Sequence, residues 1–229
     1  MALRIISGRF RRRILKTPPD QSTRPYTDRV RQIVFDRLGE DRIVGARVAD
    51  VFAGVGTMGM ESLSRGAATC VFIEAGPDVY PLLRENVQTI APDVPTVCWR
   101  TDVRRTSFRP KNADECLPYT LVFFDPPYAM FDQMLPGKPL SLYDSLTRIA
   151  RDTVTTTDAD LLIRTSERDE LPPHPAWAVF ERWDVSTMTV WRMRKPAAIN
   201  STALDAHPDE ADEAAAADEE SSGSTTSSC

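Results

Sequence analysis

The sequence lacks long apolar runs, clustered cysteines and clustered histidines. No stretch of the 229 residues approaches the roughly 18 consecutive apolar residues that a membrane-spanning helix needs, and the first residues hold no apolar core of a secretory signal. The four cysteines have no CxxC spacing and no histidines grouped with them. This pattern argues against structural zinc and against a disulfide framework. We therefore expect a cytoplasmic protein that needs neither a membrane nor a metal ion.

Basic residues are absent from the end of the chain and concentrated at its start. Residues 197–229 contain eight acidic residues and no Lys or Arg, and their Ala, Asp, Glu, Ser and Thr content predicts a disordered tail. The formal net charge is −5, yet without this tail the chain carries +3. Residues 1–31 hold nine basic and two acidic residues. This segment is either a contact surface for nucleic acid or a solvated arm, and charge alone does not decide between them.

The first part of the chain predicts a hairpin followed by a helix. Apolar runs at 3–6 and 10–15 flank Ser7, Gly8 and Arg9, and glycine can adopt the positive φ of a hairpin turn. Thr27 has the chemistry of a helix N-cap, and Gly39 that of a helix stop. Between them, apolar residues recur at helical spacing: Val30, Ile33, Val34 and Leu38.

Beyond residue 46 the sequence alternates between strand and helix patterns. We predict strands at 47–53, 69–73, 96–100, 119–124 and 160–164, helices at 58–65, 78–90 and 142–150, and an antiparallel pair at 178–183 and 187–193. This alternation indicates an α/β fold with a parallel sheet covered by helices on both faces. The expected organisation is a basic hairpin extension (1–22), one α/β domain (23–195) and the acidic tail (196–229). Ligands of such sheets bind beyond the carboxyl ends of the strands.

A glycine motif follows the first strand of the α/β domain. Gly54, Gly56 and Gly59 form a GxGxxG pattern between strand and helix, and Glu74 follows the next strand twenty residues after Gly54. Glycines let the backbone approach a ligand, and a carboxylate at the second strand can accept both ribose hydroxyls of an adenosine. The motif predicts an adenosine-containing ligand. The plainer alternative is a tight packing turn and a surface glutamate.

Two acidic residues favour S-adenosylmethionine (SAM) over NAD as that ligand. Asp50 precedes the glycine turn, where it suits the cationic amino group of SAM better than an anionic pyrophosphate. Asp102, at the end of the third strand, can accept a hydrogen bond from an adenine amine.

A second motif, Asp125-Pro126-Pro127-Tyr128, follows the strongly apolar fourth strand. The Asp125 carboxylate and the Pro126 carbonyl are both acceptors and can hold the two N–H bonds of one exocyclic amine. The nitrogen lone pair would then face a methyl donor, and Tyr128 can stack on the planar base that carries the amine. This pattern predicts amino-group methylation. A simple strand-ending turn is the alternative.

With these motifs the chain resembles the RsmD family, bacterial methyltransferases that modify guanine N2 in small-subunit ribosomal RNA. The resemblance runs from about residue 4 to 194 and rests on four segments: residues 4–8 (RIISG), 24–31 (RPYTDRVR), 50–66 (DVFAGVGTMGMESLSRG) and 125–128 (DPPY). It implies a seven-stranded, Rossmann-like SAM-dependent methyltransferase sheet whose last strand is antiparallel. The chain departs from the usual pattern at Gly76, in the loop 129–142 and near the final turn at 184–189.

The resemblance also implies roles for individual residues. The implied SAM contacts are Asp50, Phe52, Gly54, Gly56, Glu74 and Asp102. The implied contacts of the target amine and base are Asp125, Pro126 and Tyr128. The implied RNA-binding residues are Arg4, Arg9, Arg11, Arg12, Arg13, Arg24 and Arg29.

We therefore expect a SAM-dependent enzyme that methylates guanine N2 in 16S ribosomal RNA, free or within the small ribosomal subunit. Three alternatives remain at this point: an adenine N6 methyltransferase for DNA or RNA, an NAD-dependent oxidoreductase, and a non-catalytic RNA-binding relative. Outside the motifs, we expect His174 to be exposed to solvent, and Trp177, Trp183 and Trp191 to pack in the core.

Overall fold

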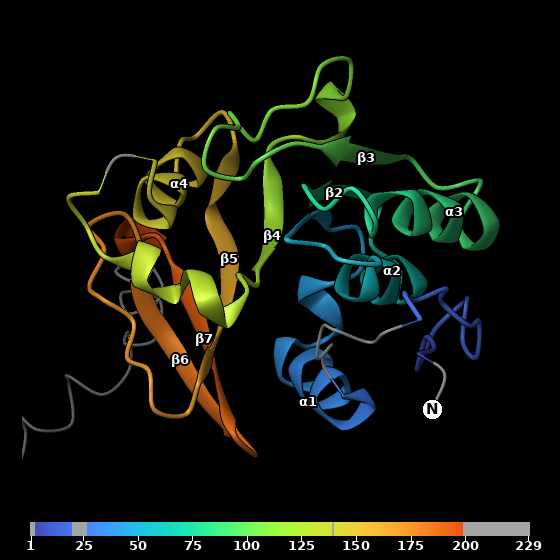
Figure 1. The fold of residues 1–229 in the computed structure, drawn as a ribbon, viewed down its shortest axis with the longest axis horizontal. Coiled ribbons are helices and arrows are strands. Elements are labelled where there is room, and N and C mark those ends of the chain that lie inside the picture. The colour runs from blue at the N-terminus through green and yellow to red at the C-terminus, as the bar shows by residue number, and fades with distance from the viewer. Residues whose placement is uncertain (1–2, 20–26, 139, 199–229) are drawn as a thin grey trace, which may run out of the picture.

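A computed structural model describes residues 3–19, 27–138 and 140–198. Arg24 and the predicted acidic tail beyond residue 198 lie outside these ranges. The described chain forms one seven-stranded sheet with helices on both faces (Figure 1).

The strands follow the order β3-β2-β1-β4-β5-β7-β6. Strands β1 to β5 run parallel, and β7 runs antiparallel to both β5 and β6. This confirms the predicted α/β sheet with an antiparallel last strand. The bounds are β1 (Arg47–Val51), β2 (Thr69–Glu74), β3 (Thr96–Arg100), β4 (Tyr119–Phe124), β5 (Thr155–Ser166), β6 (Ala178–Val185) and β7 (Met188–Arg194).

Alternating residues along the strands pack into two separate hydrophobic cores. Val48 and Phe72 belong to the core shared with α1 (Asp28–Leu38), α2 (Thr57–Ser64) and α3 (Tyr80–Ile90), whereas Val51 and Ile73 face α4 (Leu142–Ile149). Short 3-10 turns complete the fold: η1 (Glu40–Arg42), η2 (Asp114–Cys116) and η3 (Tyr128–Met134). Within the described ranges, no helix has both the length and the apolar character needed to cross a membrane.

Helix α1 begins and ends where its residues predict. The Thr27 side chain accepts a hydrogen bond from the Val30 amide at 3.3 Å, and Gly39 ends the helix at φ 81°. The prediction of an exposed His174 is wrong, because its side chain packs on Tyr143 with a ring separation of 4.4 Å and is only 7% exposed. The three tryptophans are buried, as expected.

The N-terminal hairpin is present and is fastened to the C-terminal half of α2. Arg4 and Ile14 form an antiparallel bridge, and Gly8 turns the chain at φ 80°. A Cβ at Gly8 would lie 1.8 Å from the Ser64 carbonyl oxygen, so only glycine allows this approach. The buried Glu61 carboxylate accepts hydrogen bonds from the backbone amides of residues 6 and 7. These contacts fix the hairpin to the domain.

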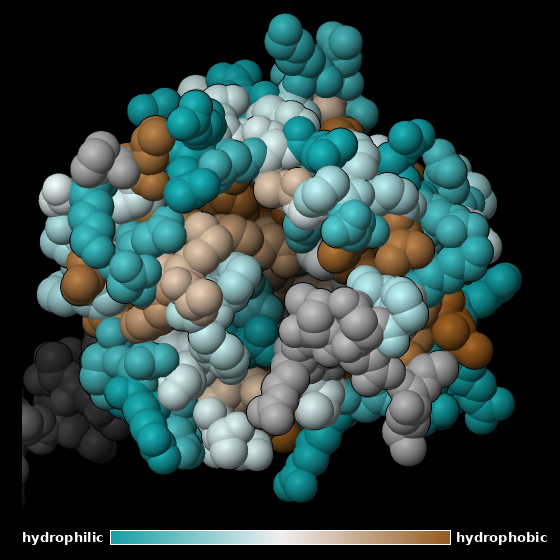
Figure 2. Space-filling model, viewed as in Figure 1, coloured by the Kyte–Doolittle hydropathy of each residue, from teal (hydrophilic) through white to brown (hydrophobic). Residues whose placement is uncertain are grey.

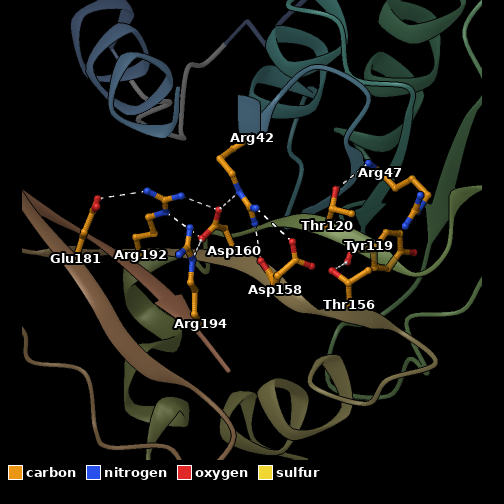
Figure 3. A network of polar contacts seen from close by, with 10 residues as sticks. All are labelled: Arg42, Arg47, Tyr119, Thr120, Thr156, Asp158, Asp160, Glu181, Arg192 and Arg194. Atoms are coloured by element: carbon orange, nitrogen blue, oxygen red, sulfur yellow. Dashed lines mark hydrogen bonds and ion pairs between the residues drawn. The ribbon is translucent and has the colours of Figure 1, made fainter. Parts of the chain in front are cut away.

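A buried ion network ties β5 and β7 to η1 (Figure 3). The fully buried Asp160 carboxylate accepts hydrogen bonds from Arg42 at 2.7 Å, Arg192 at 2.8 and 2.9 Å, and Arg194 at 2.7 Å. Burial alone would raise the pKa of Asp160, but hydrogen bonds from Arg192 and Arg194 and the nearby Arg42 charge hold it below its ordinary value. One carboxylate on β5 therefore neutralises charge from three arginines on two other elements, η1 and β7.

We expect Asp160→Ala to destabilise the fold by about 3–5 kcal/mol, because it leaves several buried guanidinium groups without their shared partner. Urea unfolding at pH 7 measures this loss. Asp158→Ala is the matched control, since its exposed carboxylate pairs with Arg42 at 3.3 Å and hydrogen-bonds Thr156 and should contribute about 1 kcal/mol or less. Equal effects of the two substitutions would contradict this account of the network.

Candidate active site

The glycine motif forms a tight turn from β1 into α2, and each glycine meets a different demand. Gly54 and Gly56 adopt positive φ values of 56° and 91°. No atom lies within 4 Å of a Cβ built on Gly54, so open space borders the loop there. A Cβ on Gly59 would lie 2.3 Å from the Phe72 ring. Gly54 and Gly56 therefore supply the positive φ values of the turn, with open space beside Gly54, whereas Gly59 lets α2 pack on β2.

Glu74, at the end of β2, lies across this loop. Its Oε2 accepts a hydrogen bond from the Gly54 amide at 2.8 Å, and its Oε1 accepts one from the Gly76 amide at 2.6 Å. A Cβ on Gly76 would lie 2.9 Å from Oε1, so a larger residue there would require the Glu74 side chain to shift. The carboxylate is thus held at the carboxyl edge of the sheet, where the sequence places a ribose contact.

Asp50 is buried beneath the same loop. Its Oδ2 accepts a hydrogen bond from the Gly59 amide at 2.8 Å, near the N-terminus of α2. Burial, together with the nearby Asp125 and Glu74 charges, raises the pKa of Asp50 to about 8, although the Gly59 bond opposes the shift. No ion pair with Asp50 is present in the described part of the chain. A cationic ligand group would supply the missing positive charge, whereas a pyrophosphate would add negative charge.

Two other predicted cofactor contacts have local partners. Asp102 follows β3 and binds the Arg104 guanidinium, with its shortest contact at 2.8 Å. Hydrogen bonds from the Arg104 side chain lower the pKa of Asp102. Phe52 adopts φ 64° and contacts Phe124 edge to face at 5.4 Å. Asp102 therefore offers an ionised acceptor, and Phe52 a fixed ring at the loop.

The second motif lies beside the first because β4 is the parallel neighbour of β1. The Asp125 amide donates to the Val51 carbonyl at 3.3 Å, which anchors the turn to the end of β1. Pro127 caps η3, and Tyr128 begins it with its side chain 48% exposed. Figure 2 shows that this face of the molecule is hollowed near its centre, with apolar surface inside and hydrophilic side chains around it.

Sequence reasoning missed a partner of Asp125. Arg164, on β5, donates from Nε to Asp125 Oδ1 at 2.8 Å. Its guanidinium carbon also lies 5.6 Å from the centre of the Tyr128 ring. Burial raises the pKa of the Asp125 carboxyl, and the positive charge and hydrogen bond of Arg164 oppose that rise.

A second missed residue is Asn86 of α3. Its side-chain amide donates to the Val55 carbonyl in the glycine loop and to the Lys16 carbonyl, both at 3.1 Å. Its Oδ1 accepts from the Lys16 amide at 2.8 Å. Asn86 therefore joins the glycine loop to the end of the N-terminal hairpin. Only the apolar spacing of α3 was visible in the sequence, and that spacing gave no sign of this bridge.

The arginines predicted to bind RNA fall into two groups. Arg4 and Arg9 pair with Asp28 and Asp93, respectively. The others that the structure describes are exposed and take part in none of its ion pairs: Arg11, Arg12, Arg13 and Arg29. Arg29 also borders a groove of about 740 Å³ between α1 and the β6–β7 turn, at the same edge of the sheet as the Asp125 turn. Within the described ranges, no group of three potential metal ligands occurs.

The chain is similar in sequence to known proteins. The family described as "Conserved hypothetical protein 95" matches residues 3–190. Ribosomal RNA small subunit methyltransferase D of Escherichia coli is 38% identical over 126 residues, which cover 55% of this chain and 60% of that protein. YlbH of Bacillus subtilis is 32% identical over 126 residues, covering 55% of this chain and 67% of YlbH. These alignments thus span about three fifths to two thirds of the relatives.

Solved structures extend the similarity to nearly the whole fold. The Escherichia coli protein yhhF superposes with a TM-score of 0.68 at 27% identity, covering 85% of this chain and 98% of that one. The rRNA methyltransferase aviRa of Streptomyces viridochromogenes shares the fold alone, with a TM-score of 0.56 at 16% identity.

The fold and the site together define a methyltransferase of the Rossmann-like class. Within that class, the chain belongs to the family described as "Conserved hypothetical protein 95", which is the RsmD family that its motifs indicate.

Proposed function

We propose that this protein transfers a methyl group from SAM to the exocyclic N2 amine of a guanine in small-subunit ribosomal RNA. The observation that carries the proposal is the adjacency of two acceptor-bearing turns. The Asp125 turn is bonded to the end of β1, and the glycine loop begins directly after β1. An amine held at the first turn would face a ligand held at the second. The name of the E. coli relative supports the choice of ribosomal RNA.

The loop after β1 fits SAM in charge and in shape. The buried Asp50 and the loop-bound Glu74 are carboxyl groups that a cationic ligand can face, and open space borders Gly54. We assign Glu74 to the ribose hydroxyls, Asp50 to the side of the amino group, and Asp102 to the adenine amine. Phe52 and Gly56 would complete the surface. When bound, SAM supplies an electrophilic methyl group on a positively charged sulfur, which departs as a neutral thioether.

The Asp125 turn would orient the nucleophile. Asp125 and the Pro126 carbonyl accept the two amine hydrogens, so that the nitrogen lone pair is free to attack. Tyr128 would stack on a base that has been turned out of its helix. The amine nitrogen loses one proton as it gains the methyl group, and the Asp125 carboxylate is the nearest assigned group that can accept it.

The basic surface would hold the RNA around this turn. Arg11, Arg12 and Arg13 are presented by the hairpin, and Arg29 by the groove beside α1. Guanidinium groups pair readily with phosphate, and their attraction for RNA weakens with salt. Arg4, Arg9 and Arg24 complete the proposed set.

Nucleoside mass spectrometry tests the proposal directly. Purified protein and methyl-labelled SAM are incubated with small ribosomal subunits that lack the modification, and in parallel with naked 16S RNA. We expect labelled N2-methylguanosine in at least one substrate. Labelled N6-methyladenosine would instead support the adenine alternative. SAM binding without transfer to either substrate would contradict the proposal and favour a non-catalytic relative. Binding of NAD rather than SAM would favour the oxidoreductase.

A further inference from the structure

Arg164 lies at the point where the two halves of the proposed site meet. Ile163 of β5 is paired with Phe124 of β4, so the residues that follow them, Arg164 within β5 and Asp125 just beyond β4, lie side by side. Their side chains are 10% and 18% exposed, respectively. The guanidinium is therefore part of the carboxyl edge of the sheet and is shielded from most of the solvent.

The contacts of Arg164 involve both side chains assigned to the target base. Its Nε donates to Asp125 Oδ1 at 2.8 Å, and its guanidinium lies over the Tyr128 ring at 5.6 Å. The hydrogen bond restricts rotation of the carboxylate and engages Oδ1, while Oδ2 stays an acceptor for an incoming amine. The cation–π contact restrains an otherwise half-exposed ring.

The charge of Arg164 matters because the surroundings of Asp125 disfavour an ionised carboxylate. The charged or titratable groups that face Asp125 are Asp50 from β1, Arg164 from β5 and, through the guanidinium, Tyr128 from η3. Burial favours the protonated form of Asp125, and the charge and hydrogen bond of Arg164 oppose it. A protonated carboxyl has one oxygen that donates, so it could no longer offer two acceptor oxygens or take up a proton.

We propose that Arg164 is a positioning residue for the target amine, which it serves by holding the Asp125 carboxylate ionised and in a fixed orientation and by supporting the Tyr128 ring. The proposal rests on the function proposed above. It adds a residue outside both motifs, contributed by a different strand.

The test compares Arg164→Met and Arg164→Lys with the unaltered protein. Methylation of modification-free small ribosomal subunits is measured from pH 5 to 9 at saturating SAM. Removal of the guanidinium should lower kcat about tenfold to a hundredfold through misorientation of the carboxylate. Loss of its charge in Arg164→Met should also raise the pKa of Asp125, which shifts the acidic limb of the kcat profile to higher pH by about one unit or more. Arg164→Lys keeps a charge, so its acidic limb should stay near that of the unaltered protein while its rate falls.

Arg47→Met is the matched control. Arg47 also belongs to the sheet, but its Nε donates to the Pro118 carbonyl at the opposite edge, so neither rate nor pH profile should change. All variants should bind SAM normally in calorimetry, because Asp125 and Tyr128, which Arg164 contacts, lie outside the glycine loop. If Arg164→Met fails to fold, Arg164→Gln replaces it, since it also lacks the charge and should shift the acidic limb to higher pH in the same way.

Two results would overturn the role of Arg164. One is an unaltered kcat and pH profile in Arg164→Met. The other is an equal loss of rate in both variants with an unmoved acidic limb, which indicates a merely structural residue. Asp125→Asn, measured in parallel, separates this failure from failure of the proposed function. A fully active Asp125→Asn contradicts the proposed chemistry itself, whereas an inactive Asp125→Asn with a normal Arg164→Met contradicts only the inference.

Discussion

Asp125→Ala is expected to lose methyl transfer by about 10²–10³-fold, because it removes the acceptor that orients the amine and can receive its proton. SAM affinity should survive, since the Asp125 side chain hydrogen-bonds Arg164 on β5, outside the glycine loop. Affinity near neutral pH should even rise slightly. The Asp125 charge helps to raise the pKa of Asp50, so its removal leaves Asp50 more fully ionised. Single-turnover transfer to small ribosomal subunits and calorimetry with SAM measure the two quantities separately.

Two control variants test whether the loss of activity in Asp125→Ala comes from a loss of structure. Asp125→Asn preserves the size of the side chain and leaves an oxygen that Arg164 can still bind, so its stability should be close to that of the unaltered protein. Asp132→Ala, on η3, removes an exposed carboxylate that pairs with Lys138 at 3.3 Å. It should retain full activity. Transfer by Asp125→Ala within about threefold of the unaltered protein would show that the chemistry occurs elsewhere.

The parts of this site that were predictable depend on local backbone rules. Gly54 and Gly56 mark positive φ, and apolar runs mark the strands that precede them. Parallel strands bring such turns to one edge, so Asp50, Glu74 and Asp125 could be placed together without coordinates. The Thr27 cap and the final antiparallel pair were also predictable, because their signals lie within a few residues.

The parts that sequence reasoning missed are side-chain partnerships between distant elements. Arg164 and Asp125 are 39 residues apart, and Asn86 and Lys16 are 70 apart. In neither pair does the sequence separation single out the two partners from the other arginines, asparagines or acidic residues in the chain. The prediction that His174 is exposed was wrong for a related reason. Its Pro-rich surroundings suggested a solvated loop, but that loop returns to α4 and buries the ring against Tyr143.

Proton release on SAM binding is the second large effect that the structure predicts. Asp50 has a pKa of about 8 because of burial and the neighbouring Asp125 and Glu74 charges. At pH 7 a carboxyl of that pKa is about 90% protonated in the free protein. The cationic amino group of SAM would favour the ionised form and lower this pKa, so binding should release close to one proton at pH 7 and less at pH 9. Calorimetry in buffers of different ionisation enthalpy measures the number released.

Asp50→Asn should abolish that proton release and weaken SAM binding, while the Asn oxygen still accepts the Gly59 hydrogen bond. Asp102→Asn is the control, because Arg104 already keeps the pKa of Asp102 low. Its proton release should therefore match that of the unaltered protein. SAM binding by the unaltered protein with no proton released at pH 7 would contradict a protonated Asp50 beside the ligand.

As the pH rises, the stability of the folded protein should fall while its affinity for SAM rises. The folded-state pKa of Asp50 lies above its unfolded value, so the folded protein holds this proton more tightly. The resulting stability is fully present below about pH 4 and is lost as the pH rises through about 8.

Asp50→Asn cannot ionise, so its stability should not fall over this pH range. It should therefore match the unaltered protein at pH 4 and exceed it at pH 8, by an amount that approaches about 5 kcal/mol at most. Thermal or urea unfolding at the two pH values, without SAM, measures the difference, and an equal effect at both would assign the penalty to a group other than Asp50. The Asp50 carboxyl therefore lowers the stability of the fold at the pH where a cationic ligand would bind beside it. A loss of stability of this kind is expected of a residue that serves binding and not folding.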